Sequence, residues 1–339
     1  MATLADVARH AGVSTATASR IINGSPKPVA EALRERVLAA VAELRYVPNA
    51  HAQMLARSHR SAVGVIVHDV SDPYFAEITR GLQRVATADG RLVIICNSYR
   101  DPDRQLEYID LLHAHQVAAI VIAGSGYRDA AVAAKLDERL RAFEAVGGRV
   151  AVIGRHEHTG DAVVPDNEHG GFLAGEHLCT SGHTKIGVIA GPAGLTTTED
   201  RLSGLRKAFR KYGRTLPKQR LVYADFTRDG GSAAADTLIA ADPSVTAIAA
   251  LNDSMAVGAL AALRAAGRLP GFDGPPVAVI GFDDMPIARD VTPTLTTVRL
   301  PLAELGERAM TLALAAPGDD PRVERVAAEL VPRESTWPA

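Results

Sequence analysis

The chain has 339 residues, of which 47% are hydrophobic and 22% are charged, and its formal net charge is −2. This composition excludes a disordered chain, and the length predicts about two or three domains. No segment approaches the roughly 18 uninterrupted apolar residues of a membrane span, and the N-terminus shows no basic stretch followed by an apolar run, as a secretory signal would. Cys96 and Cys179 are too widely separated to suggest a disulfide framework or a metal site. We therefore expect a cytoplasmic protein with no membrane partner.

Charge is distributed unevenly along the chain. Residues 1–60 contain eight Lys or Arg and four Asp or Glu, a net charge of +4, whereas the remaining residues carry a net charge of −6. A basic head on an acidic body is typical of a protein in which only the head contacts a polyanion. A solvated charged surface would give the same balance, so charge alone does not decide between the two.

Two short helices are predicted at the start of the head. Thr3, followed three residues later by Asp6, indicates a capping box for the first helix, which ends at Gly12. Ser14 is the expected cap of a second helix over residues 15–22. Two short helices joined through one glycine are typical of a helix-turn-helix, whose second helix enters the major groove of DNA.

A third helix is predicted over residues 30–44, where apolar side chains recur at helical spacing. On the second helix, Ala18, Ile21 and Ile22 are expected to pack inward. A small three-helix cap without DNA-binding function is the alternative. The residues on the opposite face, which can reach base edges, are Thr15, Ala16 and Arg20.

The order of residues in this head resembles the lactose-repressor/galactose-repressor (LacI/GalR) family. The matching strings are LADVARHAGVS at 4–14, TASRIING at 17–24, RERV at 34–37 and LRYVPNA at 44–50. The resemblance implies that Thr15, Ala16 and Arg20 read bases, and an arginine fork suits guanine because it can bond O6 and N7 together. It also implies DNA-backbone contacts, which set register, for three further residues. These are Thr17, Ser19 and Asn23.

The head departs from the family pattern at two positions. Ala30 and Leu33 stand where relatives usually have Ser or Thr, so one helix cap and one phosphate contact are not expected here. Residues 47–60 then form the hinge. By resemblance, this hinge becomes helical when two copies pair over the minor groove, with Leu55 as a wedge between base pairs and Ala52 allowing close approach. A plain linker is the alternative.

The body, residues 61–339, is predicted to be α/β. Short apolar runs alternate with amphipathic segments, which is typical of βαβ units and a parallel sheet, and two sets of about four runs predict two similar subdomains. We expect the first subdomain over about 61–160 and 291–319, and the second over about 161–290 and 320–339. The head is expected to end at residue 46. The runs are 63–67, 92–96, 118–123, 150–153, 185–190, 221–223, 247–251 and 277–281.

Polar and aromatic residues follow these runs, at the strand ends where ligands of such sheets bind. Aromatic faces, a guanidinium and carboxylates around one cleft suit a small, hydroxyl-rich ligand. The body also resembles the family's effector domain, which is related to periplasmic sugar-binding proteins. Its matching strings are DPYF at 72–75, DN at 166–167, EHL at 176–178, GH at 182–183, RLSG at 201–204, NDSMA at 252–256, GFDD at 281–284, LTTV at 295–298 and REST at 333–336.

By this resemblance seven residues are the expected effector site, with Arg201 and Asp283 foremost. The seven are Tyr74, Phe75, Ser125, Arg201, Phe226, Asn252 and Asp283. Each has an ordinary structural alternative: Tyr74 and Phe75 can belong to the core. Asp253 is expected to cap a helix, and Asp284 to have a structural role. Gly154 replaces an acidic residue found in many relatives and removes one hydroxyl partner.

Other chemistry is not indicated. His156 and His158, with Glu157, Asp161 and His169 nearby, lack the regular spacing of a metal site. No phosphate-binding loop and no nucleophile elbow are present, and no cofactor is expected. An enzyme processing sugars or nucleosides on the same scaffold is one alternative, for which Asp69 would join the cleft carboxylates. A solute-binding carrier is the other, disfavoured by the basic head and by the absence of an export signal.

The sequence thus predicts a sequence-specific DNA-binding transcriptional regulator, by resemblance a repressor, controlled by a small-molecule effector. The first expectation for the effector is a sugar or related polyol, and a purine-like base is the alternative. Because one recognition helix reads few bases, we expect a homodimer on a pseudo-palindromic operator. No leucine heptad follows the body, which favours a dimer over a tetramer.

Overall fold

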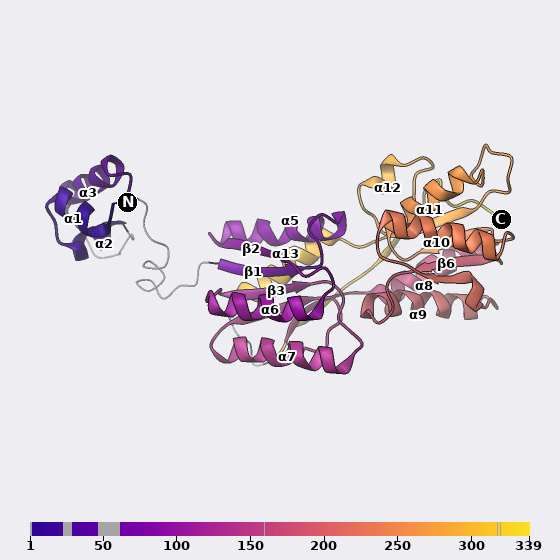
Figure 1. Ribbon diagram of the computed structural model, residues 1–339, viewed down its shortest axis with the longest axis horizontal. Coiled ribbons are helices and arrows are strands. Elements are labelled where there is room, and N and C mark those ends of the chain that lie inside the picture. The colour runs from indigo at the N-terminus through magenta and orange to yellow at the C-terminus, as the bar shows by residue number, and fades with distance from the viewer. Residues whose placement is uncertain (1, 23–28, 47–61, 159, 317, 319) are drawn as a thin grey trace. The chain divides into compact units, whose positions relative to one another are not determined.

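The structure is a computed structural model and describes residues 2–22, 29–46, 62–158, 160–316, 318 and 320–339 (Figure 1). The chain divides into two compact units, Met1–Ser61 and Ala62–Ala339, called here the head and the body. The predicted hinge at 47–60, with Ala52 and Leu55, lies outside the described residues, as does Asn23. None of the described helices is long and apolar enough to cross a membrane.

Three helices form the head: α1 (Leu4–Ala11), α2 (Thr15–Ile22) and α3 (Glu31–Glu43). The predicted capping box is present, because the Thr3 side chain accepts from the Asp6 backbone N–H and the Asp6 carboxylate accepts from the Thr3 backbone N–H. Ser14 Oγ accepts from the Thr17 backbone N–H at 3.1 Å, as expected of a cap. Ala30 gives α3 no side-chain cap. The buried core of the head is Val7, Ala8, Ala11, Ala18, Val37 and Ala40.

The body contains two six-stranded sheets, each the centre of one subdomain. The first sheet has the order β11-β5-β4-β3-β1-β2, and every pairing in it is parallel. Its strands are β1 (Ala62–Val67), β2 (Leu92–Asn97), β3 (Ala119–Ala123), β4 (Arg149–Ile153), β5 (Asp161–Pro165) and β11 (Val323–Val326). Its helices are α5 (Pro73–Ala88), α6 (Pro102–Ala114), α7 (Ala130–Ala145) and α13 (Leu302–Leu314).

The second sheet has the order β12-β10-β9-β8-β6-β7, parallel except for β12 against β10. Its strands are β6 (Ile186–Ala190), β7 (Leu221–Tyr223), β8 (Ala247–Ala250), β9 (Ala278–Asp283), β10 (Thr296–Arg299) and β12 (Glu329–Val331). Its helices are α8 (Asn167–Thr180), α9 (Thr196–Lys211), α10 (Arg228–Ala241), α11 (Asp253–Ala265) and α12 (Ile287–Asp290), with the short 3₁₀ helix η1 (Lys218–Arg220) before β7.

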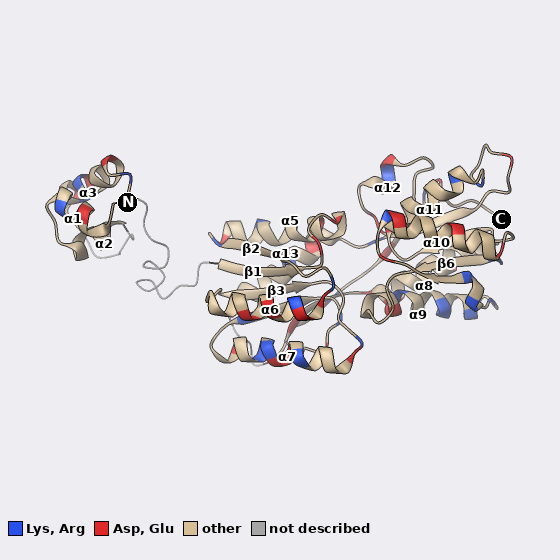
Figure 2. Ribbon diagram, viewed as in Figure 1, with Lys and Arg blue, Asp and Glu red and all other residues tan. Residues whose placement is uncertain are grey.

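Burial on both faces explains the uninterrupted apolar runs. In β1, Val63 and Val65 pack in the core cluster that includes α5 and α13 residues, whereas Ile66 packs with residues of α6 and α7. A strand covered by helices on both sides has no solvent-facing row, so it carries no polar alternation. Charged side chains are accordingly concentrated on the helices, while β1 and β6 carry none (Figure 2).

The strand pairing corrects the predicted subdomain boundaries. Strands β5 and β11 belong to the first sheet, although residues 161–165 and 323–326 were expected in the second subdomain. Strand β10 belongs to the second sheet, although residues 296–299 were expected in the first. These strands are short and β11 is half exposed, so their apolar pattern is too weak to be recognised in the sequence. The chain therefore crosses between subdomains after β5, after β10 and after β11.

The contact between α5 and α13 depends on small residues. A Cβ added to Gly306 would lie 2.1 Å from the Ile78 carbonyl oxygen of α5, and one added to Gly81 would lie 1.9 Å from the Ala303 carbonyl oxygen of α13. The two helix backbones therefore approach more closely than a side chain at either position would allow.

We predict that Gly306→Ala forces these helices apart and lowers the free energy of unfolding by about 1–3 kcal/mol, the usual cost of overpacking. Urea denaturation followed by circular dichroism measures this change. Thr311→Ala, on the exposed side of α13, is the matched control and should stay within about 0.5 kcal/mol of the wild type. Equal stability of Gly306→Ala and the wild type would contradict the close approach.

Candidate functional site

A cavity lies between the two sheets of the body, at the carboxyl ends of their strands. Its empty volume, which includes open solvent, is about 370 Å³. The residues that line it follow β1, β2 and β3 in the first subdomain and β6, β7 and β8 in the second, or end β9. All seven residues predicted for the effector site line this one cavity: Tyr74, Phe75, Ser125, Arg201, Phe226, Asn252 and Asp283.

Arg201 is the most fully bonded polar side chain of the cavity and is only 2% exposed. Its Nε donates to Asn167 Oδ1 at 2.8 Å, and its Nη1 donates to the Leu251 carbonyl at 2.6 Å. Its Nη2 donates to Asp283 Oδ1 at 2.8 Å, and the guanidinium carbon lies 3.7 Å from the centroid of the Phe282 ring. Three of five N–H donors are therefore used inside the protein, and two are left for a ligand.

Asp283, which ends β9, shares this buried position and is also 2% exposed. Burial raises the pKa of its carboxyl group to about 7, although the nearby Arg201 guanidinium opposes the rise. One carboxylate oxygen accepts from Arg201, which leaves Oδ2 as a strong acceptor at the cavity. The pair therefore offers a donor and an acceptor side by side, the combination that binds a hydroxyl group well.

Helix caps hold other lining residues in place. Asp72 caps α5 by accepting from the Tyr74 backbone N–H at 3.0 Å. Asn252 caps α11, because its Oδ1 accepts from the Met255 backbone N–H at 2.9 Å, so only its amide NH₂ is left for a ligand. The expected cap was Asp253, and this expectation is wrong. Asp253 is instead fully buried and accepts from the Met285 N–H and the Thr297 hydroxyl.

Three aromatic rings line the cavity. Tyr74 and Phe75 meet edge to face, with ring centroids 4.9 Å apart, and Phe75 is only 4% exposed. Phe75 therefore also belongs to the core, in agreement with the structural alternative for that residue. Phe226 approaches from the second subdomain, where Gly191 leaves room for its ring, since a Cβ at that glycine would lie 2.0 Å from Phe226 Cζ.

Several strand-end residues do not line the cavity. Asn97 Oδ1 accepts from the Val70 backbone N–H at 3.1 Å, and Asp69 accepts from Ser71. Asp284 is buried and accepts from Arg299 at 2.8 Å and from Arg333, which agrees with the structural role expected for it. These side chains hold turns and strand crossings together and do not face the ligand space.

Direct contacts join the two subdomains along one side of the cavity. The backbones of Gly126 and Thr196 are linked by an N–H to carbonyl bond of 3.0 Å, and Arg128 donates from its backbone to Gly194 at 2.9 Å. Arg155 forms a two-pronged ion pair with Asp200, at 2.8 and 3.1 Å. The first of these contacts lies next in sequence to Ser125 and Thr197, which line the cavity.

Five further residues line the cavity and were not predicted from the sequence. Asp72 and Thr197 lie beside predicted positions, so the strand-end rule alone could have found them. Arg100 lies three residues beyond β2, after a turn in which Tyr99 and Arg100 both have positive φ angles, 52° and 60°. Such angles are uncommon outside glycine, and no sequence signal marks them here. The five are His68, Asp72, Arg100, Gly124 and Thr197.

The histidine-rich loop after β4 is accounted for by hydrogen bonds within the protein. The His156 Nε2 lies 2.9 Å from the Gly124 carbonyl oxygen, and the His158 Nδ1 lies 2.8 Å from Asp137 Oδ1. Within the described part of the chain, no group of three or more His, Cys, Asp or Glu side chains is placed to hold a metal ion.

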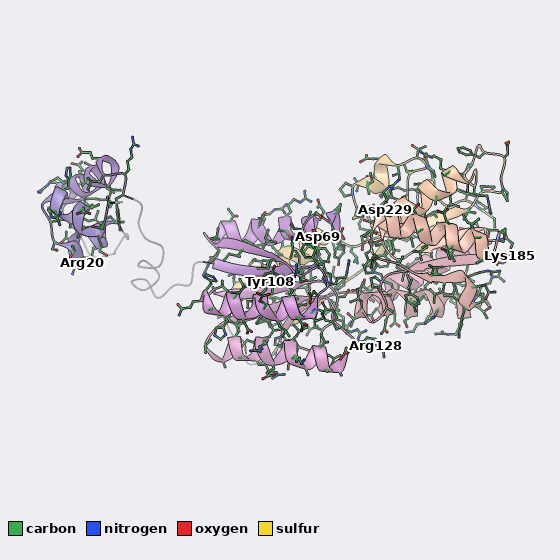
Figure 3. All side chains as sticks on the ribbon, in the orientation of Figure 1. Arg20, Asp69, Tyr108, Arg128, Lys185 and Asp229 are labelled. Atoms are coloured by element: carbon green, nitrogen blue, oxygen red, sulfur yellow. The ribbon has the colours of Figure 1, made fainter. Side chains whose placement is uncertain are left out.

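In the head, helix α2 presents a compact exposed face. Ala18 is fully buried, whereas Thr15, Ala16 and Arg20 are exposed, with Arg20 at the surface of the head (Figure 3). The Thr17 hydroxyl lies 2.8 Å from Ser14 Oγ, at the N-terminus of the helix. The orientation predicted for α2 is thus present: apolar side chains face α1 and α3, and the small or basic ones face outward.

Comparison with known proteins decides the family. Residues 3–49 match the model of bacterial regulatory proteins of the LacI family, and residues 60–331 match the model of periplasmic binding proteins and the sugar-binding domain of the LacI family. The chain belongs to the LacI family. It is 36% identical to the HTH-type transcriptional regulator GalR of Escherichia coli K12, over 96% of this chain and 92% of that one.

Further relatives agree with this assignment. The HTH-type transcriptional repressor PurR of Proteus mirabilis is 34% identical, over 93% of this chain and 90% of that one. A structure of the lac repressor dimer bound to operator and the anti-inducer ONPF aligns with a TM-score of 0.82, at 26% identity and 99% coverage of both chains. The CelR–cellobiose complex aligns with a TM-score of 0.70, at 30% identity, over 99% of this chain and all of that one.

This LacI-family chain is therefore a DNA-binding transcriptional regulator with a small-molecule-binding body. Its relatives are named as regulators and repressors and not as enzymes. The family and the fold predicted from the sequence are confirmed. The roles of individual residues in DNA or effector binding stay predictions.

We predict that Arg201→Leu lowers the free energy of unfolding by about 3–5 kcal/mol, because Asp283 would remain buried without its partner. The double variant Arg201→Leu/Asp283→Leu should recover part of this loss, since no charge is then left unpaired. Urea denaturation of the two single variants and the double variant forms a complete double-mutant cycle. Strictly additive losses would contradict a coupled pair.

A second prediction concerns how the free energy of unfolding depends on pH. Burial, with the charge of Arg100 as a smaller cause, lowers the pKa of His68 to about 3, whereas the unfolded chain takes up this proton near pH 6.5. The contribution of the neutral His68 side chain to the free energy of unfolding is thus fully present above pH 6.5 and is lost as the pH falls toward 3. Between pH 6.5 and 4, the free energy of unfolding should fall less steeply with pH in His68→Leu than in the wild type. The difference in slope should be up to about 1.4 kcal/mol per pH unit.

Thermal denaturation across that pH range measures the slope, and His115→Gln, at an exposed histidine, is the matched control. Identical slopes for the wild type and His68→Leu would show that the pKa of His68 is the same in the folded and unfolded protein and would contradict the lowered value.

Proposed function

We propose that this protein is a repressor that binds a pseudo-palindromic operator as a homodimer. Its affinity for the operator is changed by a polyhydroxylated effector, a sugar or related polyol. The observation that carries the proposal is the cavity between the subdomains. Residues of both subdomains line it, so a ligand there contacts two subdomains that are joined by three chain crossings. A ligand that binds better to one arrangement of these subdomains shifts the population toward it.

The chemistry of the cavity supports a hydroxyl-rich ligand. Asp283 Oδ2, the Asn252 amide and two N–H groups of Arg201 are polar groups of the second subdomain that remain after internal bonding. Phe226 adds an aromatic ring to the lining of the same cavity, and a sugar ring has both apolar and polar surface to offer to such a site. The related CelR is known in complex with cellobiose, and a LacI-family regulator of Enterococcus faecium is known with bound ribose.

For DNA, we propose that Thr15, Ala16 and Arg20 of α2 contact base edges and that Thr17, Ser19 and Asn23 contact the DNA backbone. The exposure of Thr15, Ala16 and Arg20 supports the first assignment. We also propose that Leu55 and Ala52 act in the minor groove; both lie outside the described residues. An arginine that bonds two acceptors of guanine discriminates against other bases by about 1–3 kcal/mol.

The first test is selection of binding sites from a pool of random duplex DNA. We expect the wild type to select a two-fold symmetric site and Arg20→Ala to lose preference at one mirrored position in each half. The loss there should be roughly 5- to 150-fold, equivalent to the 1–3 kcal/mol given above. Arg139→Ala, at an exposed arginine of α7, is the matched control and should select the wild-type site. Binding to all sequences alike, with only a steep salt dependence, would overturn the proposal.

A further inference from the structure

Arg100 reaches the cavity from the first subdomain by way of a tight turn. The Ser98 N–H donates to the Val67 carbonyl at 2.9 Å, and the Tyr99 N–H donates to the His68 carbonyl at 2.8 Å, which ties the turn to the end of β1. The Arg100 guanidinium carbon then lies 5.3 Å from the centroid of the Phe226 ring, which belongs to the other subdomain. Arg100 thus spans the cavity from one sheet to the other.

This guanidinium has no acceptor in the described part of the chain. Its Nε is out of contact with solvent and lacks a hydrogen-bond partner, and no described carboxylate lies within 4.0 Å of its nitrogens. Arg201 is different, since each of its three nitrogens has an acceptor. A half-buried cation with unused donors is costly unless a bound group satisfies it. Arg100 therefore indicates an acceptor that belongs to a ligand.

His68 provides the complementary group on the same side of the cavity. It is only 6% exposed, and its Nε2 is buried without a hydrogen-bond partner. The Ser98 hydroxyl donates its single hydrogen to the Val67 carbonyl at 3.1 Å, so toward His68 it acts as an acceptor for Nδ1–H, at 3.4 Å. The proton of the neutral ring is then on Nδ1, and Nε2 presents a lone pair that can accept a hydrogen bond.

The other charges of the cavity are already offset. Asp283 is paired with Arg201, and Asp72 lies at the N-terminus of α5, where it accepts from the Tyr74 N–H. Asp72, Asp225 and Asp69 act on the charge of Arg100 from a distance, but none of these described carboxylates lies within 4.0 Å of its nitrogens. A neutral hydroxyl group could accept one bond from Arg100 but would not form an ion pair with it. A carboxylate or phosphate group accepts two parallel bonds and neutralises the charge.

We propose that the effector is an acidic derivative of a polyol, whose carboxylate or phosphate group binds the Arg100 guanidinium and whose neighbouring hydroxyl group donates to His68 Nε2. The proposal rests on the proposed function, because it assumes that the cavity is the effector site. It adds that the ligand is an anion and that Arg100 and His68 determine specificity for it.

The test uses the full-length protein and matched pairs of probes in isothermal titration calorimetry. The carboxylate arm compares D-galactose with D-galacturonate and D-glucose with D-gluconate. The phosphate arm compares D-glucose with D-glucose 6-phosphate and D-ribose with D-ribose 5-phosphate, and inorganic phosphate is titrated alone. We expect one acidic probe to bind at least about tenfold more tightly than its neutral partner, as a charge-assisted hydrogen bond would give.

Substitutions then locate the preference. Arg100→Gln should reduce it to less than about threefold, and Arg100→Lys, which keeps the charge but lacks the planar fork, should give an intermediate value. Arg206→Gln, at an exposed arginine of α9, is the matched control and should keep the full preference. Circular dichroism of each variant verifies that it is folded.

Three results would overturn the inference. One is that no acidic probe binds more tightly than its neutral partner, another is a preference unchanged in Arg100→Gln, and the third is binding of inorganic phosphate with no gain from any sugar acid or sugar phosphate. Selection of a symmetric DNA site, measured separately, tests the proposed function. A protein that selects such a site but binds none of the acidic probes more tightly than its neutral partner would keep the proposed function and refute the anionic effector.

Discussion

A guanidinium that is almost wholly removed from water must find its hydrogen bonds and its counterion inside the protein. Arg201 does so by joining three other segments: Asn167 at the start of α8, Leu251 after β8, and β9, which provides both the Asp283 carboxylate and the Phe282 ring. The floor of the cavity is therefore rigid on the side of the second subdomain. The remaining polar groups of the site are arranged around this fixed ion pair.

The opposite side of the cavity is built differently. Arg100 and His68 come from the first subdomain and keep buried polar atoms without partners. One wall is thus held by an internal ion pair, whereas the other keeps a cation without an ion-pair partner. A ligand that completes the second wall while it touches the first lowers the free energy of the arrangement in which the walls face each other. In the proposed function, such a difference in affinity couples effector binding to a change of conformation.

The seven predicted cavity residues could be found because they follow buried strands or stand in strings shared with the family. Arg100 could not be found in this way. The end of β2 was recognised, but the obvious polar candidate there was Asn97, which instead holds the Val70 N–H. The left-handed turn at Tyr99 and Arg100 carries the chain past this position, and nothing in the residue types indicates it, since a glycine or asparagine would be expected.

The main strands were likewise predictable, because burial on both faces leaves long apolar runs. The short strands next to the crossings could not be predicted, because their apolar runs are too short or too weak to be recognised. In β11, with the sequence VERV, only Val326 is buried, so the strand resembles a loop until its partner β5 is known. Its membership of the first sheet depends on pairing with residues about 160 positions earlier, and such long-range information has no local signal.

The late crossings also govern the order in which the protein can assemble during synthesis. The first sheet begins at residue 62, but one helix that covers it, α13, and its edge strand β11 are translated only after strands β6 to β10 of the second sheet. Until then the face containing Val63, Val65 and Val67 lacks part of its cover. A nascent chain therefore exposes an apolar surface until α13 has been translated. Such surface is prone to aggregation during synthesis, and this is the interval in which a chaperone would protect it.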